Sequence, residues 1–568
     1  QSRKESLLLC ASAPPCLCAK TASPIFCSRP GTSRTLSIRR IPCSGRLCVG
    51  ILAALVAIFL AGCGSSSSRT DTLIYAQSED PKTLDPINTD IAEAVHVITN
   101  VFDTLVTYHD ETSEVVPSLA EKWETSDDGL MWTFHLRSGV RFHDGTEMNA
   151  EAVKVSFERL LAREHPLVYD AARPYQSAYS MIRQIETPDE TTVVFQLKNP
   201  SAVFLSNLAM FCGSVVSPTA LEKSGSQFAD QPVGTGPFRV AKWTRDQQLV
   251  LQRFDDHWRG AAKLKNIIFV PVRESATRLQ RLQRGEIDLA DNLSPSELNI
   301  LAKDQAMSVQ EVDGMNVCYL TMQTEKRPLD NLKVRQAIWL AINKPELIQV
   351  GYTGHADPAK SMVPPTMWGH HDKLEDRPYD LAAAKKLLEE AAAEAGFSLP
   401  LKLSLAIPNQ ARTYMPRPIE MADYLKDALA NIDIEVSVVG RDVNQHFEAL
   451  MAGKHELGLA GWNSDNADPD NFLYSLLDPD NISDAGNNLS RWRNGRFHEL
   501  LISGQKEMNQ EKRLALYHEA QQIVLDEAPV VPLAHTKIRT GHKMRLKGFH
   551  LHTTGLVRLR HAYFEEPL

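Results

Sequence analysis

The sequence lacks the short motifs that mark the common catalytic and nucleotide-binding sites. Its 568 residues contain no Gly-x-Ser-x-Gly elbow, no His-Glu-x-x-His pair and no Walker A phosphate loop. Gly234 and Gly236 do not form such a loop, because Pro237 follows them and has no backbone N–H to offer a phosphate. We expect a tight turn there, and a chain that is not an enzyme and carries no catalytic residue, cofactor or metal.

Cysteine is scarce in most of the chain. Beyond position 63 only Cys212 and Cys318 remain, each within an apolar run, and two buried thiols are favoured over a disulfide. The four cysteines within residues 1–38 lack the spacing of a metal site. We interpret residues 1–38 as translated upstream sequence or an extended leader.

Excess positive charge is confined to the start of the chain. Residues 1–62 carry eight Lys or Arg and one acid, a net charge of +7, whereas the remainder carries 53 Lys or Arg and 69 acids, a net charge of −16. An acidic chain argues against nucleic acid or an anionic membrane surface as a partner. The length and the apolar content of 43% fit a soluble protein of two or three domains.

A short apolar run follows the basic stretch Arg39–Arg46. Residues Val49–Leu60 are apolar or small and lead into the small residues before Cys63. A basic region, an apolar region and small residues predict an export signal, with an uncleaved anchor as the alternative. The ending Leu60–Cys63 resembles the lipobox of bacterial lipoproteins, which implies that Cys63 becomes the lipidated first residue. Residues 64–71 then form a flexible tether rich in serine.

Hydrophobic periodicity predicts alternating strands and helices in the rest of the chain. Strands are expected at 72–77, 191–197, 209–216, 401–406, 434–439 and 457–460, with a hairpin over 123–136. Helices are expected at 150–161, 333–343, 345–352, 380–395, 416–430 and 509–526. Asp380 is the predicted N-cap and Gly396 the predicted stop of one of these helices. Such alternation is typical of an α/β fold.

The stretch Gly461–Phe472 follows the predicted strand at 457–460 and is too rich in Asn, Asp and Pro to be helical. Its Trp462 is followed three residues later by Asp465. A flat ring and an anionic acceptor at one strand end can together hold an ammonium group. We therefore interpret this stretch as one wall of a closed ligand site.

Two other interpretations of Gly461–Phe472 are an ordinary surface turn and a calcium loop. The latter is weak, because counting from Asp465 puts Asp470 and Leu476 where an EF-hand needs Gly and Glu. The neighbouring histidines of His370–Asp372 could ligate a metal, but adjacent side chains rarely face one ion and a solvated loop is favoured.

Arg412 lies between the strand at 401–406 and the helix at 416–430. Its planar guanidinium can bind a carboxylate through two hydrogen bonds. The alternative interpretation is a solvated loop cation.

Several motifs follow one another in the order of a known family. The set comprises Leu84–Pro86, Pro117–Ala120, Trp123, Phe142–Gly145, Gly234–Phe238, Pro328–Asn331, Val334–Ala337, Met362–Pro365 and Gly461–Phe472. Together they resemble the family 5 solute-binding proteins of ABC importers, the dipeptide- and oligopeptide-binding receptors. The resemblance covers about residues 70–565.

The resemblance implies an α/β, two-lobed, periplasmic-binding-protein-like fold (type II, large cluster C type) with a hinge and an extra subdomain in the first lobe. The expected limits are 1–62 for the leader, 64–71 for the tether, 72–273 for lobe I with a subdomain at about 106–232, 274–531 for lobe II, and 532–568 for the return to lobe I. The two crossings of the hinge are expected near Pro271 and Pro532.

The resemblance also implies a function. The chain would be a lipid-anchored, monomeric receptor outside the cytoplasmic membrane that captures short peptides, above all dipeptides, and delivers them to the permease of an ABC transporter. In the family a matching Arg-x-Tyr-x-Pro segment holds the peptide carboxylate and the acid after the Trp holds its ammonium. Those roles fall on Arg412 and Asp465, with Tyr414 and Trp462 beside them. The alternatives are nickel, haem or another small solute, and, from another class, a secreted peptidase or amidase.

The lipobox assignment can be tested by removing one sulfur atom. The Cys63→Ser chain should leave the membrane fraction or stay unprocessed, because serine offers no thiol for the lipid. Radiolabelled palmitate should label the wild type and a Cys48→Ser control, but not Cys63→Ser. Wild-type protein that takes up no palmitate would contradict the assignment.

Overall fold

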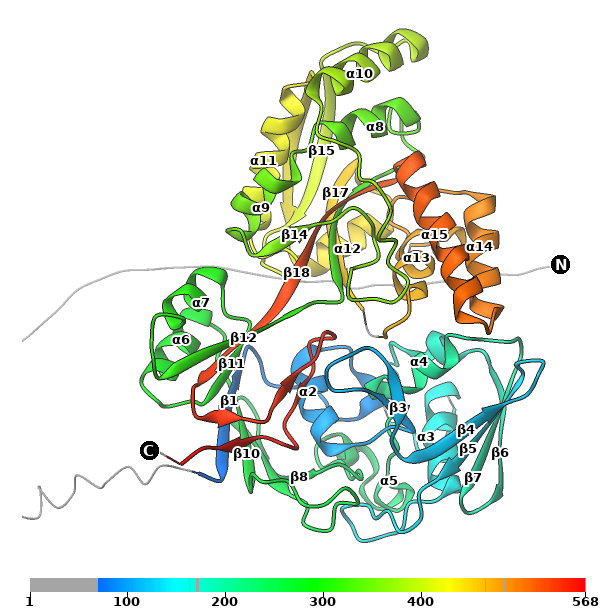
Figure 1. Ribbon diagram of the computed structural model, residues 1–568, viewed down its shortest axis with the longest axis vertical. Helices are drawn as coiled ribbons and strands as arrows, with labels where there is room; N and C mark the ends of the chain where they lie inside the picture. The colour runs from blue at the N-terminus through cyan, green and yellow to red at the C-terminus, as the bar shows by residue number, and fades with distance from the viewer. Residues whose placement is uncertain (1–69, 163, 170–172, 465, 485, 567–568) are drawn as a thin grey trace, which may run out of the picture. The chain divides into compact units, whose positions relative to one another are not determined.

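The computed structural model describes residues 70–566, apart from 163, 170–172, 465 and 485 (Figure 1). The predicted leader, the lipid-anchored Cys63 and most of the tether lie outside the described residues, as does Asp465. Within the described part, no helix combines the length and apolar character that a membrane span requires. Cys212 and Cys318 are both buried thiols that are not joined in a disulfide, as predicted.

A twelve-stranded mixed sheet organises the molecule. Its main path runs through β16 (Ile434–Arg441), β15 (Leu401–Pro408), β17 (Leu457–Asn463), β13 (Asn316–Met322), β18 (Val530–Lys543), β11 (Leu289–Asp291), β1 (Thr72–Gln77), β10 (Asn266–Pro271), β9 (Gln248–Arg253) and β8 (Phe238–Thr244). The strands β12 (Met307–Asp313) and β14 (Ala356–Pro358) pair with β18 beside this path. We call the β1 side of the molecule the first lobe and the β15 side the second lobe.

The long strand β18 belongs to both lobes. Its start, Val530–Ala534, pairs with β13 in the second lobe, and its end, Thr540–His542, pairs with β11 in the first. In Figure 1 it runs as one red arrow from the helices of the second lobe to β11 and β12. Fourteen residues of one strand therefore tie the two lobes together.

The crossing predicted near Pro271 lies elsewhere in the structure. Pro271 does end β10, but the chain then forms α6 (Ser275–Gln283), β11, α7 (Pro295–Leu301) and β12 on the first-lobe side. The apolar side chains of these elements pack with Ala76 of β1. They reach it because β11 pairs in parallel with β1. The chain crosses instead at Gly314–Met315, between β12 and β13, and again within β18.

A second, four-stranded sheet lies in the first lobe, in the order β4 (Ala120–Thr125), β5 (Met131–Leu136), β7 (Thr192–Leu197) and β6 (Ile182–Asp189), with α3 (Ala150–Leu161) packed against it. The predicted hairpin is β4–β5, and its turn residue Gly129 has φ +68°, a conformation that glycine adopts easily.

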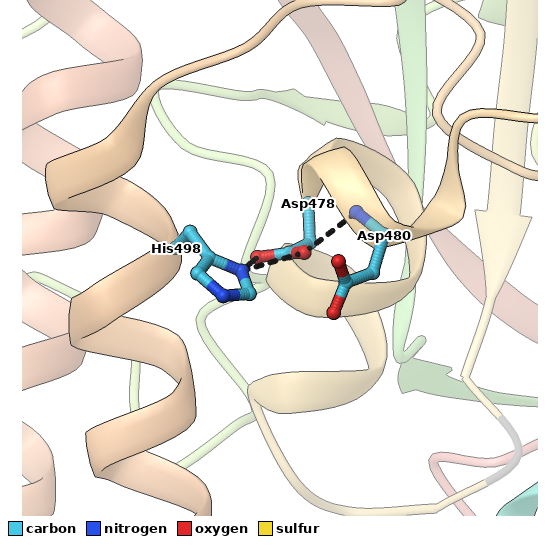
Figure 2. Close-up of side chains that lie close together, drawn as sticks. All are labelled: Asp478, Asp480 and His498. Atoms are coloured by element: carbon cyan, nitrogen blue, oxygen red, sulfur yellow. Dashed lines mark hydrogen bonds and ion pairs between the residues drawn. The ribbon is translucent and has the colours of Figure 1, made fainter.

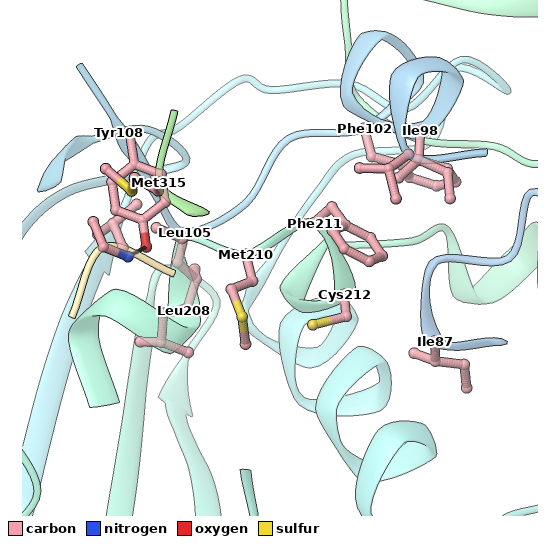
Figure 3. Close-up of a cluster of buried hydrophobic side chains, with 14 of the residues drawn as sticks. Ile87, Ile98, Phe102, Leu105, Tyr108, Leu208, Met210, Phe211, Cys212 and Met315 are labelled. Atoms are coloured by element: carbon pink, nitrogen blue, oxygen red, sulfur yellow. Dashed lines mark hydrogen bonds between the residues drawn. The ribbon is translucent and has the colours of Figure 1, made fainter. Parts of the chain in front are cut away.

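The strand predicted at 209–216 is wrong. The chain there leaves α4 (Phe204–Leu208), forms the 3-10 turn Phe211–Gly213 and bends back. A run of buried apolar residues has no periodicity that would distinguish a strand from a turn. In the structure the side chain of Asn207 holds the bend by donating to the Ala178 carbonyl at 2.8 Å. Figure 3 shows the cluster that these apolar residues join, with Phe211 and Phe102 among them.

The helices predicted for the second lobe are confirmed to within two or three residues at each end. They are α8 (Leu332–Leu340), α9 (Lys344–Tyr352), α10 (Leu381–Ala395), α11 (Pro418–Ala430) and α15 (Gln510–Glu527). The side chain of Asp380 caps α10 and Gly396 ends it in the left-handed conformation, as predicted. Further helices are α2 (Ala92–Val101) and α5 (Pro218–Ser224) in the first lobe, and α12 (Val443–Met451), α13 (Asp470–Leu477) and α14 (Gly495–Lys506) in the second.

The turn predicted at Gly234–Gly236 packs against the end of α2. The Gly236 N–H donates to the Val101 carbonyl at 2.9 Å. A Cβ at Gly234 would stand 2.3 Å from that carbonyl oxygen, so only glycine fits. Close packing on a helix explains this motif without a phosphate.

The Leu84–Pro86 motif rests on a buried ion pair. Arg159 of α3 is 0% exposed, and its Nη2 lies 2.5 Å from Oδ2 of Asp85. Asp85 also caps the short turn Pro86–Asn88 by accepting from the Ile87 N–H. The pair thus joins the first turn of the lobe to α3.

Breaking this pair should destabilise the first lobe strongly. Arg159→Met leaves the Asp85 carboxylate buried without its cation, and we expect a loss of about 3–5 kcal/mol in the free energy of unfolding. Lys122→Met, which breaks an exposed pair with Glu124, should cost less than about 1 kcal/mol. Urea unfolding of both variants checks this, and equal midpoints would contradict the role of Arg159.

Candidate functional site

The candidate site lies at the carboxyl end of β17. This strand is flanked by β15, in parallel, and by β13, antiparallel, and Leu457–Gly461 are buried. Its last residues leave the core, since Trp462 is half-buried and Asn463 exposed. The strand is thus longer than predicted and carries Trp462 to the edge of the sheet.

The ring of Tyr414 occupies the space beside Gly461. A Cβ at Gly461 would lie 2.1 Å from Cδ2 of this ring. Tyr414 is buried, its carbonyl accepts from the Tyr352 hydroxyl at 2.9 Å, and the neighbouring Thr413 hydroxyl accepts from the Asn463 side chain at 3.0 Å. The structure therefore brings together the two segments predicted to hold opposite ends of a ligand.

Arg412 is presented by a tight turn. Its backbone N–H and carbonyl both bond to Met415, each at 2.9 Å, which fixes the loop before α11. Its side chain is exposed, as a ligand-binding cation requires. Burial raises the pKa of the Tyr414 hydroxyl, and the positive charge of Arg412 and its hydrogen bond to this hydroxyl act against the rise.

The segment after β17 is folded around Asn471. The Oδ1 of Asn471 accepts from the Trp462 indole N–H at 2.7 Å and from the Ser464 hydroxyl at 3.1 Å. Asn471 lies in α13, which begins at Asp470, so the stretch predicted to lack a helix is helical over its last three residues. The helix starts directly after Pro469, which has no N–H to leave unpaired at a helix start.

The residues on either side of Asp465 are held in both lobes. The Ser464 N–H donates to the Met315 carbonyl at 2.8 Å, next to the chain crossing. Asn466 donates through its side chain to Asn207 of the first lobe at 2.7 Å. Asp465 itself is not described, but its neighbours are thus fixed where the lobes meet.

Tyr108 makes a second contact between the lobes. Its hydroxyl accepts from the Ala467 N–H at 3.1 Å and donates to the Ser206 carbonyl at 2.9 Å. Sequence reasoning missed Tyr108 and Asn207, because neither belongs to a recognisable motif and the partner of each lies more than 250 residues away.

Two further carboxylates of the segment are occupied inside the protein. Asp468 pairs with both terminal nitrogens of Arg513, at 3.0 Å each. Gln505 donates to Asp470, whose pKa is raised to about 7 by burial and by the negative charge of Asp468. Both carboxylates are thus occupied by protein partners, which disfavours the calcium loop.

The possible metal ligands have protein partners of their own. Figure 2 shows His498 of α14 turned toward Asp478; its Nδ1 lies 3.1 Å from both carboxylate oxygens, and Asp478 also caps the next turn by accepting from the Asp480 N–H. His370 bonds to the Val363 carbonyl at 2.7 Å, whereas His371 stacks on His518. These contacts explain each cluster by local packing.

Adding one methyl group should disrupt the site. In Gly461→Ala the new Cβ would overlap the Tyr414 ring, so either the ring or β17 must move, and we expect about 2–4 kcal/mol lost in the free energy of unfolding. The matched control is Gly495→Ala at the start of α14, where a Cβ meets nothing within 4 Å. Urea unfolding compares the two, and a Gly461→Ala protein as stable as the control would show that Tyr414 can leave this space freely.

Comparison with known proteins identifies relatives over most of the chain. Residues 114–484 match the family described as bacterial extracellular solute-binding proteins, family 5 Middle. The dipeptide-binding protein of Escherichia coli (strain K12) is 32% identical over 523 residues, which cover 89% of this chain and 96% of that protein. Heme-binding protein A of Haemophilus influenzae is 33% identical over 502 residues, covering 85% of this chain and 91% of that protein.

A solved structure shares the fold. The ABC transporter-associated periplasmic binding protein DppA from Helicobacter pylori, in complex with the peptide STSA, matches with a TM-score of 0.76 and 32% identity, covering 88% of this chain and 99% of that one. The two-lobed α/β fold predicted from the motifs is confirmed. In sequence and in fold, this chain belongs to family 5 of the bacterial extracellular solute-binding proteins.

Proposed function

We propose that the chain is the receptor of an ABC importer for short peptides, above all dipeptides. The observation that carries the proposal is the contact between Tyr414 and Gly461, which brings the segment that carries the exposed Arg412 against β17. In this proposal Arg412 supplies the cation of the site, and Asp465, three residues after Trp462 in the sequence, supplies the acid. A zwitterion with a carboxylate at one end and an ammonium at the other fits this order of charges.

In this proposal Arg412 binds the peptide carboxylate and Asp465 the ammonium. Arg412 has the tight turn to Met415 behind it, and Asp465 has fixed neighbours in Ser464 and Asn466. Trp462 presents a half-buried ring to the ammonium end. Since the anchors recognise the two termini, the side chains of the peptide are left to secondary contacts.

Closure of the lobes would complete the site. Asn466 and Ala467 already contact Asn207 and Tyr108 across the lobes, so a ligand held by Asp465 would lie next to the contacts that keep the lobes together. Binding would then shift the population toward the closed form, with the connections at Gly314–Met315 and in β18 as the pivots.

The remaining parts of the proposal concern place and partners. The receptor would act as a monomer at the outer face of the cytoplasmic membrane, anchored by lipid at Cys63, and would pass its peptide to the permease subunits. The relatives named as dipeptide-binding and the peptide complex of the Helicobacter protein support this assignment. The haem-binding relative supports the main alternative ligand.

Blocking the termini of one dipeptide tests both anchors. Wild-type protein should bind the free dipeptide best, and Asp465→Ala or Arg412→Ala should each cost on the order of 2–5 kcal/mol, because one ligand charge loses its partner in a desolvated site. Asp465→Ala should not weaken the N-acetylated dipeptide further, and Arg412→Ala should not weaken the amide further. Calorimetry with the free, acetylated, amidated and doubly blocked forms measures this.

Exposed residues elsewhere supply matched controls. Arg493→Ala and Asp484→Ala remove exposed side chains of the same types and should leave every affinity unchanged. Wild-type protein that binds the doubly blocked dipeptide as tightly as the free one would overturn the proposal. Haemin and Ni²⁺ are titrated in parallel. If either binds and the dipeptide does not, that alternative ligand is the correct one. Loss of intact dipeptide during incubation would instead indicate a peptidase.

A further inference from the structure

A cavity in the first lobe lies apart from the peptide site. Its volume is about 110 Å³, room for several waters or for one small ion with its nearest waters. Its lining residues come from four parts of the first lobe, within 99–118, 209–214, 237–259 and 556–561, so none belongs to the second lobe. Thr107 lines it, whereas the next residue of β2 (Val106–Tyr108) is Tyr108, whose hydroxyl contacts the second lobe. Successive strand residues point to opposite faces, so the cavity lies on the other side of β2 from the peptide site.

Three arginines line this cavity. Arg558 pairs with Asp110 at 2.6 Å and also donates to the Tyr108 carbonyl. Arg259 and Arg560 differ from it, because among the residues that the structure describes neither has a carboxylate oxygen within ion-pair distance. Arg259 donates to the Pro117 carbonyl at 3.2 Å, and Arg560 donates to the carbonyl of Arg259.

The positive charge of Arg259 disfavours that of Arg560. Desolvation lowers the pKa of the half-buried Arg560 and the positive charge of Arg259 lowers it further, while the negative charges of Asp103 and Asp110 act against this shift. The side chain of Arg259 reaches solvent; desolvation on its cavity side lowers its pKa, Asp103 acts against this and Arg137 adds to it. An anion between them would remove the repulsion and supply the acceptors that the guanidinium groups lack.

A buried histidine in the cavity wall also lacks a partner. His257 is 4% exposed, and its Nδ1–H donates to the Gly260 carbonyl at 3.2 Å. Among the described residues its Nε2 has no hydrogen-bond partner, although Oδ2 of Asp103 lies 3.7 Å away, within ion-pair distance but beyond hydrogen-bond distance. Buried polar atoms of this kind are rarely left unpaired.

Asp103 adds an acceptor to the same wall. Burial alone would raise its pKa, but the neighbouring His257 and Trp258 hold the pKa of Asp103 well below its usual range, so it is ionised. The Thr235 hydroxyl and the Trp258 indole N–H both donate to its Oδ2, at 2.9 and 3.0 Å. Thr235 is the middle residue of the Gly234–Gly236 turn, which thus helps to position this carboxylate.

We propose that this cavity binds a small oxyanion that still carries a proton: hydrogen phosphate, or the singly ionised phosphate group of a small monoester. Arg259 and Arg560 would bind its charged oxygens. Its P–O–H group would donate a hydrogen bond to Asp103, because an ionised carboxylate can only accept. Sulfate, which is fully ionised, has no such proton to donate. Nε2 of His257 can accept from such a ligand when the ring is neutral and donate to it when the ring is protonated.

Calorimetry with inorganic phosphate tests the proposal. Wild-type protein should bind phosphate, and sulfate at equal ionic strength should bind at least about tenfold more weakly. Arg560→Gln and Arg259→Gln should each weaken phosphate about tenfold or more, since each removes one charge-assisted contact. Arg284→Gln, at an arginine whose side chain is 68% exposed, is the matched control and should change nothing. Glycerol 3-phosphate, titrated next, shows by its affinity relative to phosphate whether the free ion or a monoester is preferred.

Folding and peptide binding are checked separately. Arg560→Gln without phosphate should melt at or above the wild-type temperature, because it removes a repulsive contact, and phosphate should raise the melting temperature of the wild type but not of this variant. Dipeptide affinity should be the same in all variants. Absence of phosphate binding at about 10 mM would overturn the proposal, as would affinities equal for phosphate and sulfate or unchanged in both arginine variants.

Discussion

The pairing of β18 is the constraint on which the two-lobed arrangement depends. Its first residues pair with strands of the second lobe and its last residues with strands of the first, so the twelve-stranded sheet is continuous between the lobes only through this strand. A hydrogen-bonded strand bends and twists but does not swing freely as a loop does. Any motion between the lobes must therefore come from bending or twisting of a short length of β18 and of Gly314–Met315. The pairing of β18 within the sheet limits the direction of that motion. The segment after β17, which we propose binds the ligand, begins one strand away from β18, since Ser464 bonds to Met315 itself.

Local sequence was sufficient for elements whose stability is local. The helix α10 has its apolar stripe, its N-cap Asp380 and its stop Gly396 within 17 consecutive residues, and it was predicted correctly. The hairpin β4–β5 is set by its turn and its alternation in the same way. The run at 209–216 carries no such signal, because residues buried on all sides show neither helical nor strand periodicity.

Long-range pairing limited what could be predicted of the fold and of the site. The chain crossing was misplaced because a proline marks the end of β10 but does not say that β11 returns to β1. In the site, residue type suggested Arg412, Tyr414 and Trp462, and the structure brings their segments together through Gly461. The partner of Asp468 is 45 residues away in α15, and no pattern in either segment indicates that the two side chains meet.

The raised pKa of Asp470 links the stability of this protein to acidity. The carboxyl is protonated up to about pH 7 in the folded chain but only up to about pH 4 in an unfolded one, so folding takes up a proton between these values. Its contribution to stability is complete below about pH 4 and declines by up to about 1.4 kcal/mol per pH unit until it is lost near pH 7. Since Gln505, which donates to Asp470, accepts through its carbonyl from the Ala202 N–H of the first lobe, mild acid strengthens the fold where the lobes touch.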